Sequence, residues 1–375
     1  MRVEKMKKIL KFIKTQPMLV IAFAATLVTM FIIPPDAEYL EYCNRTVLIQ
    51  LFCLMAAVGG FRSIGLFEKA TAILLKSAGT VRRLGIILTL ICFFTSMLLT
   101  NDVALITFVP LTLLVYSYIP DEKSRIFTIV LETAAANLGS MVTPFGNPQN
   151  LYLYDVYELR VGDFFGTMLP VGILSLILLL LLCLILPKDK CTAKITEQQK
   201  IPIIKCAVYI ALFLICLLTV FRVIPDWLCL ISAVIISAIL NWRLLLKVDY
   251  CLIATFVCFF VFVGNIARIE AVREFFSEVL AECEVIISVL LSQVISNVPA
   301  AVMLSEFTEN GKALLLGVNI GGLGTIIASL ASLISFQYYR SSEGARSGKY
   351  MLVFSAVNIG LLAILMLFSI TIYAY

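Results

Sequence analysis

The sequence predicts an all-α polytopic membrane protein made of two inverted-topology repeats, each with a re-entrant hairpin and an interrupted helix. Of its 375 residues, 61% are hydrophobic and 14% are charged, with a mean hydropathy of +1.02. Soluble domains carry about 25% charged residues, so this chain cannot cover a water-facing surface. The apolar runs are continuous, which favours spanning helices over a β-barrel. Two pairs of polar-broken apolar segments recur along the chain and indicate the repeats.

Charge and cysteine content exclude several other classes. The net charge of +5 does not indicate a nucleic-acid partner, because the basic residues lie in short loops between apolar runs. Most of the 11 cysteines lie inside those runs, and no CxxC pair occurs, so neither a metal centre nor a redox site is predicted. We expect no cofactor and only Na⁺ as a possible coupling ion. Since the chain has no histidine, a proton relay would have to use carboxylates.

The first predicted region, residues 1–45, holds a basic N-terminus and a first span over 18–33. Pro34 and Pro35 follow this run in place of a small-residue cleavage pattern, so we interpret it as an uncleaved span. The other complete or interrupted spans are predicted over 46–66, 125–156, 164–187, 202–221, 227–245, 250–269, 312–336 and 350–372.

Two further apolar stretches, 84–118 and 284–307, each contain a polar break. We predict them to be hairpins because each limb is short, and non-helical backbone persists at membrane depth only where protein or a watery cavity satisfies it. With a cytoplasmic N-terminus and each hairpin returning to its own side, 22 of the 29 Lys and Arg residues fall inside and six outside. The positive-inside rule favours this topology in a cytoplasmic (inner) membrane.

The two halves of the chain repeat each other's polar positions. The segment SMLLTNDVAL from Ser96 aligns with SQVISNVPAA from Ser292, and the segment NLGSMVT from Asn137 aligns with NIGGLGT from Asn319. Four full crossings separate 46–66 from 250–269, so the two repeats run in opposite directions. The predicted division is a first repeat at 46–187, a cytoplasmic loop with connecting spans at 188–249, and a second repeat at 250–375.

Helix breaks supply the chemistry expected of an ion site. The start of a helix offers free N–H groups to an anion, and the end of a helix offers free carbonyl oxygens to Na⁺. Pro144 and Pro148 are predicted to break the first interrupted helix, while the second has no proline and is expected to break more mildly. The candidate substrate- or ion-binding residues are Thr100, Asn101, Asp102, Asn137, Thr143, Gly146, Asn147, Asn150, Ser296, Asn297, Asn319, Thr325, Ser329 and Ser332.

Each candidate also has a purely structural interpretation. Asn101 and Asn297 suit helix caps as well as ligand contacts. Asp102 is a candidate for binding the coupling ion, or else an exposed residue of the hairpin tip or a second helix cap. Glu132 is either a proton carrier or the partner of Arg62 or of a cation in a loop. No catalytic residue is predicted.

Four phrases of the chain resemble signature regions of the ion transporter superfamily. They are TNDVALITFVP, ANLGSMVTPFGNPQNLYLY, SNVPAAVML and NIGGLGTIIASLASLIS. This superfamily holds citrate transporters, divalent-anion/sodium symporters, arsenite permeases and some Na⁺/H⁺ antiporters, and the resemblance covers roughly residues 46–370. It implies an elevator-type mechanism, binding at the hairpin tips and a homodimer. The acid beside the tip asparagine, in Thr100-Asn101-Asp102, is similar to the arsenite-permease and antiporter branch.

These observations predict a secondary active transporter in the lipid bilayer that moves a small anion, such as a carboxylate, an oxyanion or arsenite, coupled to Na⁺ or H⁺. A Na⁺/H⁺ antiporter using Asp102 is the alternative within the same class. A passive channel or a membrane-embedded enzyme is more remote. The chain has no HExxH motif, P-loop or Ser/His/Asp set, so we expect it not to be an enzyme.

Overall fold

The computed structural model describes residues 16–75, 78–119, 121–191 and 201–373, and every regular element within these ranges is helical. The basic segment before Gln16 lies outside them. Long apolar runs form the helices because each backbone polar group is satisfied within its own helix. Within the described ranges, seven helical segments are long and apolar enough to cross a membrane: Arg45–Ser63, Val81–Leu99, Val161–Cys183, Ile203–Val220, Asp226–Lys247, Tyr250–Ala267 and Ser347–Ile372.

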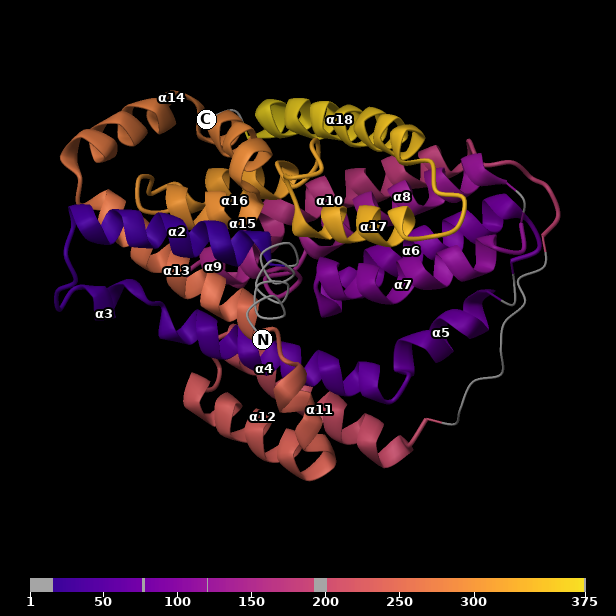
Figure 1. Cartoon of the computed structure of the whole chain (residues 1–375), viewed down its shortest axis with the longest axis horizontal. Coiled ribbons are helices and arrows are strands. Elements are labelled where there is room, and N and C mark those ends of the chain that lie inside the picture. The colour runs from indigo at the N-terminus through magenta and orange to yellow at the C-terminus, as the bar shows by residue number, and fades with distance from the viewer. Residues whose placement is uncertain (1–15, 76–77, 120, 192–200, 374–375) are drawn as a thin grey trace, which may run out of the picture.

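The helices form two groups. In the flanking group, α4 packs against α11 and α12, and α13 packs against α2 (Figure 1). Its members are α2 (Pro17–Ile32), α3 (Tyr39–Tyr42), α4 (Arg45–Ser63), α11 (Ile203–Val220), α12 (Asp226–Asn241), the 3₁₀ helix η1 (Trp242–Lys247) and α13 (Tyr250–Ala267). α5 (Leu66–Leu75) runs from this group towards α6.

The central group contains both predicted hairpins and both interrupted helices. α8 packs against α6, α7, α10, α17 and α18, while α14 packs against α15 and α16. Figure 1 shows α18 along one edge of the molecule and α11 and α12 at the opposite edge. The members of the central group are α6 (Val81–Leu99), α7 (Asn101–Tyr116), α8 (Glu122–Ser140), α9 (Pro148–Val156), α10 (Val161–Cys183), α14 (Glu270–Ile295), α15 (Asn297–Leu304), α16 (Gly311–Ile320), α17 (Leu330–Arg340) and α18 (Ser347–Ile372).

Both hairpins turn at the positions that the sequence predicts, but the first limb of the first hairpin, α6, is not short: its 19 residues are enough to cross a membrane. α6 gives way to α7 at Thr100, where φ is 95°, and α14 gives way to α15 at the equivalent Ser296, where φ is 77°. Positive φ is unusual for residues with a β-carbon and costs about 1–3 kcal/mol, so the surrounding packing must hold both tips in place. Non-helical dihedral angles at Cys283 separate the amphipathic start of α14 from its hairpin limb.

Both interrupted helices are present as well. α8 ends at Ser140 and α9 begins at Pro148, where the absent N–H of proline costs nothing. α16 ends at Ile320 and α17 begins only at Leu330. The expectation of a milder second break was therefore wrong. In the second repeat glycines interrupt the helix in place of proline. Gly324 adopts φ +94°, a backbone conformation that favours glycine.

The two repeats use the same contacts to hold a hairpin limb against an interrupted helix. Thr143 Oγ1 donates a hydrogen bond to the carbonyl of Met97 at 2.6 Å, and the equivalent Thr325 Oγ1 donates to the carbonyl of Gln293 at 3.1 Å. In the sequence alignment Met97 also corresponds to Gln293. Thr143 and Thr325 are thus equivalent in structure as well as in sequence.

Close helix packing depends on glycines in both repeats. A β-carbon on Gly139 would lie 2.1 Å from the Phe93 carbonyl oxygen, and one on the equivalent Gly321 would lie 2.8 Å from Ser292 Oγ. Gly321, in the second break, is therefore required for close helix packing.

Candidate ion- and substrate-binding site

The centre of the molecule holds a hydrogen-bond network that crosses between the repeats. Asn137, near the end of α8, accepts a hydrogen bond on Oδ1 from Ser329 Oγ at 2.9 Å. Its Nδ2 donates to Ser332 Oγ at 3.3 Å. All three side chains are buried, so each has exchanged water for a partner in the opposite repeat.

The equivalent asparagine of the second repeat makes the reciprocal contacts. Asn319 Oδ1 accepts from Asn147 Nδ2 at 3.1 Å, and Asn319 Nδ2 donates to Asn150 Oδ1 at 2.6 Å. In the sequence alignment Asn147 corresponds to Ser329 and Asn150 to Ser332. Each repeat's asparagine therefore binds the same two positions of the other repeat's break, as an inverted two-fold arrangement requires.

Both hairpin tips reach this network. Asn101 Nδ2 donates to Asn137 Oδ1 at 3.0 Å, and Asn101 Oδ1 accepts from the backbone N–H of Asp102 at 3.0 Å. In the second hairpin, the backbone N–H of Asn297 donates to the Ala328 carbonyl at 3.0 Å. Ser296 Oγ donates to the same carbonyl at 3.3 Å. Residues 328 and 329 thus connect the two tips. Asn101 reaches Ser329 with its side chain, through Asn137 Oδ1, whereas Asn297 reaches Ala328 with its backbone N–H.

Some candidate residues have a clear structural task. Asn150 Nδ2 donates to the carbonyls of Met141 and Thr143 at 3.1 and 3.0 Å, which satisfies two carbonyls of the first break. A β-carbon on Gly146 would lie 2.2 Å from the Ser140 carbonyl oxygen, so this position requires glycine. Thr143 and Thr325 hold the hairpin limbs. Whether these residues bind an ion stays a prediction.

Asp102 lines two cavities beside the network. The larger, of about 420 Å³, reaches Thr100 and Asn147 and carries the charged side chains of Arg62, Lys247 and Asp249. The smaller, of about 260 Å³, lies between the two tips and is lined by Asp102, Asp249, Val298 and Pro299 among others. Asp102 is half-buried, so the interpretation of an exposed tip residue was wrong.

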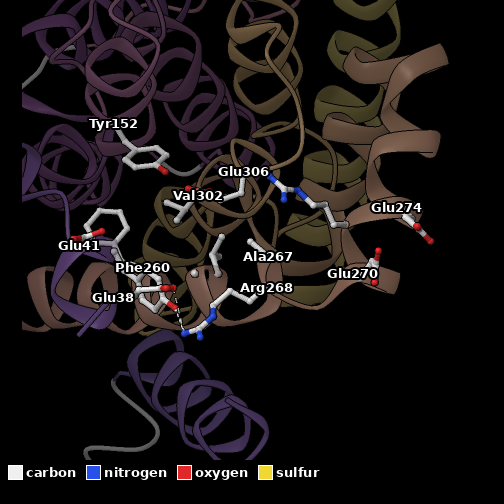
Figure 2. A pocket seen from close by; sticks show the side chains of 14 residues that line it. Glu38, Glu41, Tyr152, Phe260, Ala267, Arg268, Glu270, Glu274, Val302 and Glu306 are labelled. Carbon is white, nitrogen blue, oxygen red and sulfur yellow. Dashed lines mark hydrogen bonds and ion pairs between the residues drawn. The ribbon is translucent and has the colours of Figure 1, made fainter. Parts of the chain in front are cut away.

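A third cavity, of about 770 Å³, is strongly acidic (Figure 2). It lies between the end of α13, the start of α14, α15 and the segment before α4. Arg268 lines this cavity and forms ion pairs there, with its Nη1 2.7 Å from Asp36 Oδ2 and 3.5 Å from Glu38 Oε2. Its charged lining consists of five glutamates and two arginines: Glu38, Glu41, Glu270, Glu274, Glu306, Arg268 and Arg273.

Glu132 is not the partner of Arg62. Glu132 is fully buried, with Oε1 accepting a hydrogen bond from Thr112 Oγ1 at 2.6 Å, whereas Arg62 is exposed and lines the larger Asp102 cavity. Sequence reasoning also missed Asp249, which caps α13 by accepting from the Leu252 N–H at 3.0 Å. An acid directly before a predicted span was the signal that could have found it.

Comparison with known proteins agrees with this architecture. The family model described as citrate transporter matches residues 9–310. The chain belongs to the citrate transporter family. Among family relatives, the uncharacterized transporter MJ0456 of Methanocaldococcus jannaschii is 33% identical over 350 residues, which cover 93% of this chain and 96% of that protein.

Two further proteins are similar over most of their length. The inner membrane protein YbiR of Escherichia coli is 31% identical over 294 residues, covering 77% of this chain and 78% of YbiR. The crystal structure of the YdaH transporter of Alcanivorax borkumensis superposes with a TM-score of 0.53 at 14% identity, covering 94% of this chain and 96% of that one. The latter likeness concerns the fold alone. This citrate transporter family member is thus a multi-pass membrane transporter.

Proposed function

We propose that the protein is a secondary active transporter of a small anion, coupled to H⁺ or Na⁺, in the cytoplasmic membrane. The observation that carries the proposal is that four helices, two from each repeat, begin at one buried polar centre: α7, α9, α15 and α17. The start of a helix offers N–H groups and a partial positive charge to an anion. The anions that fit this chemistry are carboxylates such as citrate and dicarboxylates, inorganic oxyanions and arsenite.

The larger Asp102 cavity supports an entry route for an anion. Arg62 and Lys247 line it, and it extends to Thr100 and Asn147 beside the network. Basic groups in a low-dielectric cleft attract anions and speed their arrival. Asp102 and Asp249 in the same cavity would attract the coupling cation, so both ions could enter from one side.

Alternating access would move the central group against the flanking group. The two groups meet where α4 packs on α9, where α5 reaches α6, and where α13 packs on α14 and α15. The flanking group would then be the fixed part of an elevator and the place where two copies form a homodimer. Reciprocal contacts between the inverted repeats suit such a movement, because the equivalent helices could exchange their surroundings.

Replacing either tip asparagine tests the binding site. We expect Asn101→Ala and Asn297→Ala each to reduce uptake of citrate, succinate, phosphate or arsenite into proteoliposomes by about 10–100-fold, since a hydrogen bond to a charged group contributes about 1.5–3 kcal/mol. The control is an unchanged elution profile and melting temperature of each variant. Wild-type rates in both variants would contradict the site assignment.

A Na⁺/H⁺ antiporter is the second candidate, and the acidic cavity favours it. Five glutamates against two arginines would concentrate cations and repel free anions. Asp102 would then carry the exchanged cation, in competition between Na⁺ and H⁺.

The antiporter candidate has its own measurement. Proteoliposomes without any organic or inorganic substrate anion should show Na⁺-driven proton movement, reported by an internal pH dye, and Asp102→Asn should abolish it. Asp155→Asn, at the end of α9, serves as the control carboxylate. Absence of proton movement in the wild type, together with anion uptake, would exclude antiport.

A further inference from the structure

We propose that Glu132 of α8 is a proton-binding site that couples proton movement to the asparagine network, and this rests on the proposed transport function. Its carboxyl group is fully buried between α6, α7 and α18. Oε1 accepts a hydrogen bond from Thr112 Oγ1, while Oε2 has no hydrogen-bond partner among the described residues. An oxygen in that position is free to carry a proton.

The charge balance around Glu132 requires such a proton. Within the described ranges no Lys or Arg forms an ion pair with it. An ionised carboxylate enclosed without a counter-ion costs several kcal/mol, whereas the protonated acid carries no charge. In the conformation described here Glu132 therefore holds a proton, and a change that admits water or a cation would release it.

The fold itself does not need an acid at this place. In the alignment of Asn137 with Asn319, Glu132 corresponds to Leu314, which is also fully buried. The same helix position thus accepts leucine in the second repeat. A group that the packing does not require, placed where it is costly, indicates a functional role.

A stripe of polar side chains connects Glu132 to the start of α8. Ser124, Thr128 and Glu132 are spaced by four residues, so they share one face of the helix, and all three are buried. Thr128 Oγ1 lies 2.8 Å from the Tyr116 hydroxyl, and Ser124 Oγ donates to Asp121 Oδ2 at 2.5 Å. These hydroxyls offer a route for protons between the start of α8 and Glu132.

A second set of hydroxyls connects the neighbourhood of Glu132 to the substrate site. Thr133 Oγ1 of α8 donates a hydrogen bond to Ser335 Oγ of α17 at 2.7 Å. One turn further along α8, Asn137 Nδ2 donates to Ser332 Oγ, which also belongs to α17. The Tyr350 hydroxyl of α18 faces Thr133 and Ser335. Repacking of α17 on α8 would therefore change both the network and the surroundings of Glu132.

The neighbouring groups favour a proton over Na⁺. The titratable groups that face Glu132 or its cluster are two thiols and three phenols, and none of them is a hard anionic ligand. Packed around α8, they are Cys92 of α6, Tyr116 of α7, Cys183 of α10, Tyr339 of α17 and Tyr350 of α18.

Glu132→Gln in proteoliposomes tests the proposal. Glutamine keeps an acceptor for Thr112 but binds no exchangeable proton. We expect substrate exchange at zero gradient to continue, while stimulation of uptake by an inward proton gradient is lost. Glu132→Leu, which copies Leu314, is expected to fold and to behave in the same way. Glu158→Gln, an exposed carboxylate between α9 and α10, is the control and should keep the proton stimulation.

Three results would overturn the proposal or separate it from the proposed function. Proton stimulation that persists in Glu132→Gln would show that the carboxyl group is only structural. Stimulation by a Na⁺ gradient that disappears in Glu132→Gln would assign the site to Na⁺. If the wild type transports none of the anions, the proposed function fails. The proton site is then tested separately by an infrared difference spectrum of wild type minus Glu132→Gln, because a protonated carboxyl group has its own carbonyl band. Absence of that band would contradict the proton site.

Discussion

Gly139→Val prevents α8 from packing against the first limb of its hairpin. The new β-carbon would meet the Phe93 carbonyl oxygen at 2.1 Å and Ser96 Oγ at 2.5 Å. The first of these atoms belongs to the backbone of α6, so a side-chain rotation cannot relieve the clash. Overpacking costs about 1–3 kcal/mol, and the two extra methyl groups of valine place it at the upper end. A thermal unfolding curve in detergent measures the loss.

The matched control for Gly139→Val is Gly360→Ala on α18. A β-carbon on Gly360 has no atom within 4 Å, and the residue lies inside a helix. Alanine favours a helix over glycine by about 1 kcal/mol, so this variant should melt at the same or a higher temperature. Equal melting temperatures for Gly139→Val and the wild type would contradict the packing of α8 on α6.

Asn319→Leu is expected to damage the first repeat from a position in the second. It leaves Asn147 Nδ2 and Asn150 Oδ1 without their partner on Asn319, and both side chains are buried. Asn147 Nδ2 keeps a hydrogen bond to Ser140 Oγ at 3.3 Å, whereas Asn150 Oδ1 loses its donor on Asn319, and an unsatisfied buried group costs about 1–3 kcal/mol. We expect a large drop in melting temperature and no measurable transport in proteoliposomes.

Another buried asparagine provides the control for this variant. Asn358 of α18 donates to the carbonyl of Phe354 in its own helix, and its Oδ1 has no partner among the described residues. Asn358→Leu therefore removes one unsatisfied oxygen, and the protein should keep its stability. If Asn319→Leu and Asn358→Leu lowered the melting temperature equally, the hydrogen bonds between the repeats would contribute no more to stability than any other buried asparagine.

The helices, hairpin tips and breaks were predictable because their signals are local. Continuous apolar runs mark the spans, and the tips at Thr100 and Ser296 stand out as polar residues between short apolar limbs. Comparison of the two halves also paired Asn137 with Asn319 before any contact was known. The side-chain pairings across the repeats were not predictable, because they depend on how two distant segments face each other.

The errors arose where tertiary packing decides. Asp102 was open to interpretation as an exposed residue, and only the walls contributed by α13 and α15 enclose it. Arg62 or a loop cation was one of the two interpretations of Glu132, because an acid in a span normally finds a cation. The second break was expected to be mild because proline is the familiar breaker, whereas glycines replace it there.

The crossed asparagine bonds also determine the order in which the molecule can be completed. Asn147 and Asn319 are 172 residues apart in the chain, and Ser329 and Asn137 are 192 apart. During synthesis the earlier members of these pairs wait, without their native partners, until nearly the whole polypeptide has been inserted. Contacts between such remote residues form slowly. The apolar exterior of each half must therefore assemble first, and the polar interior closes as one of the last events of folding.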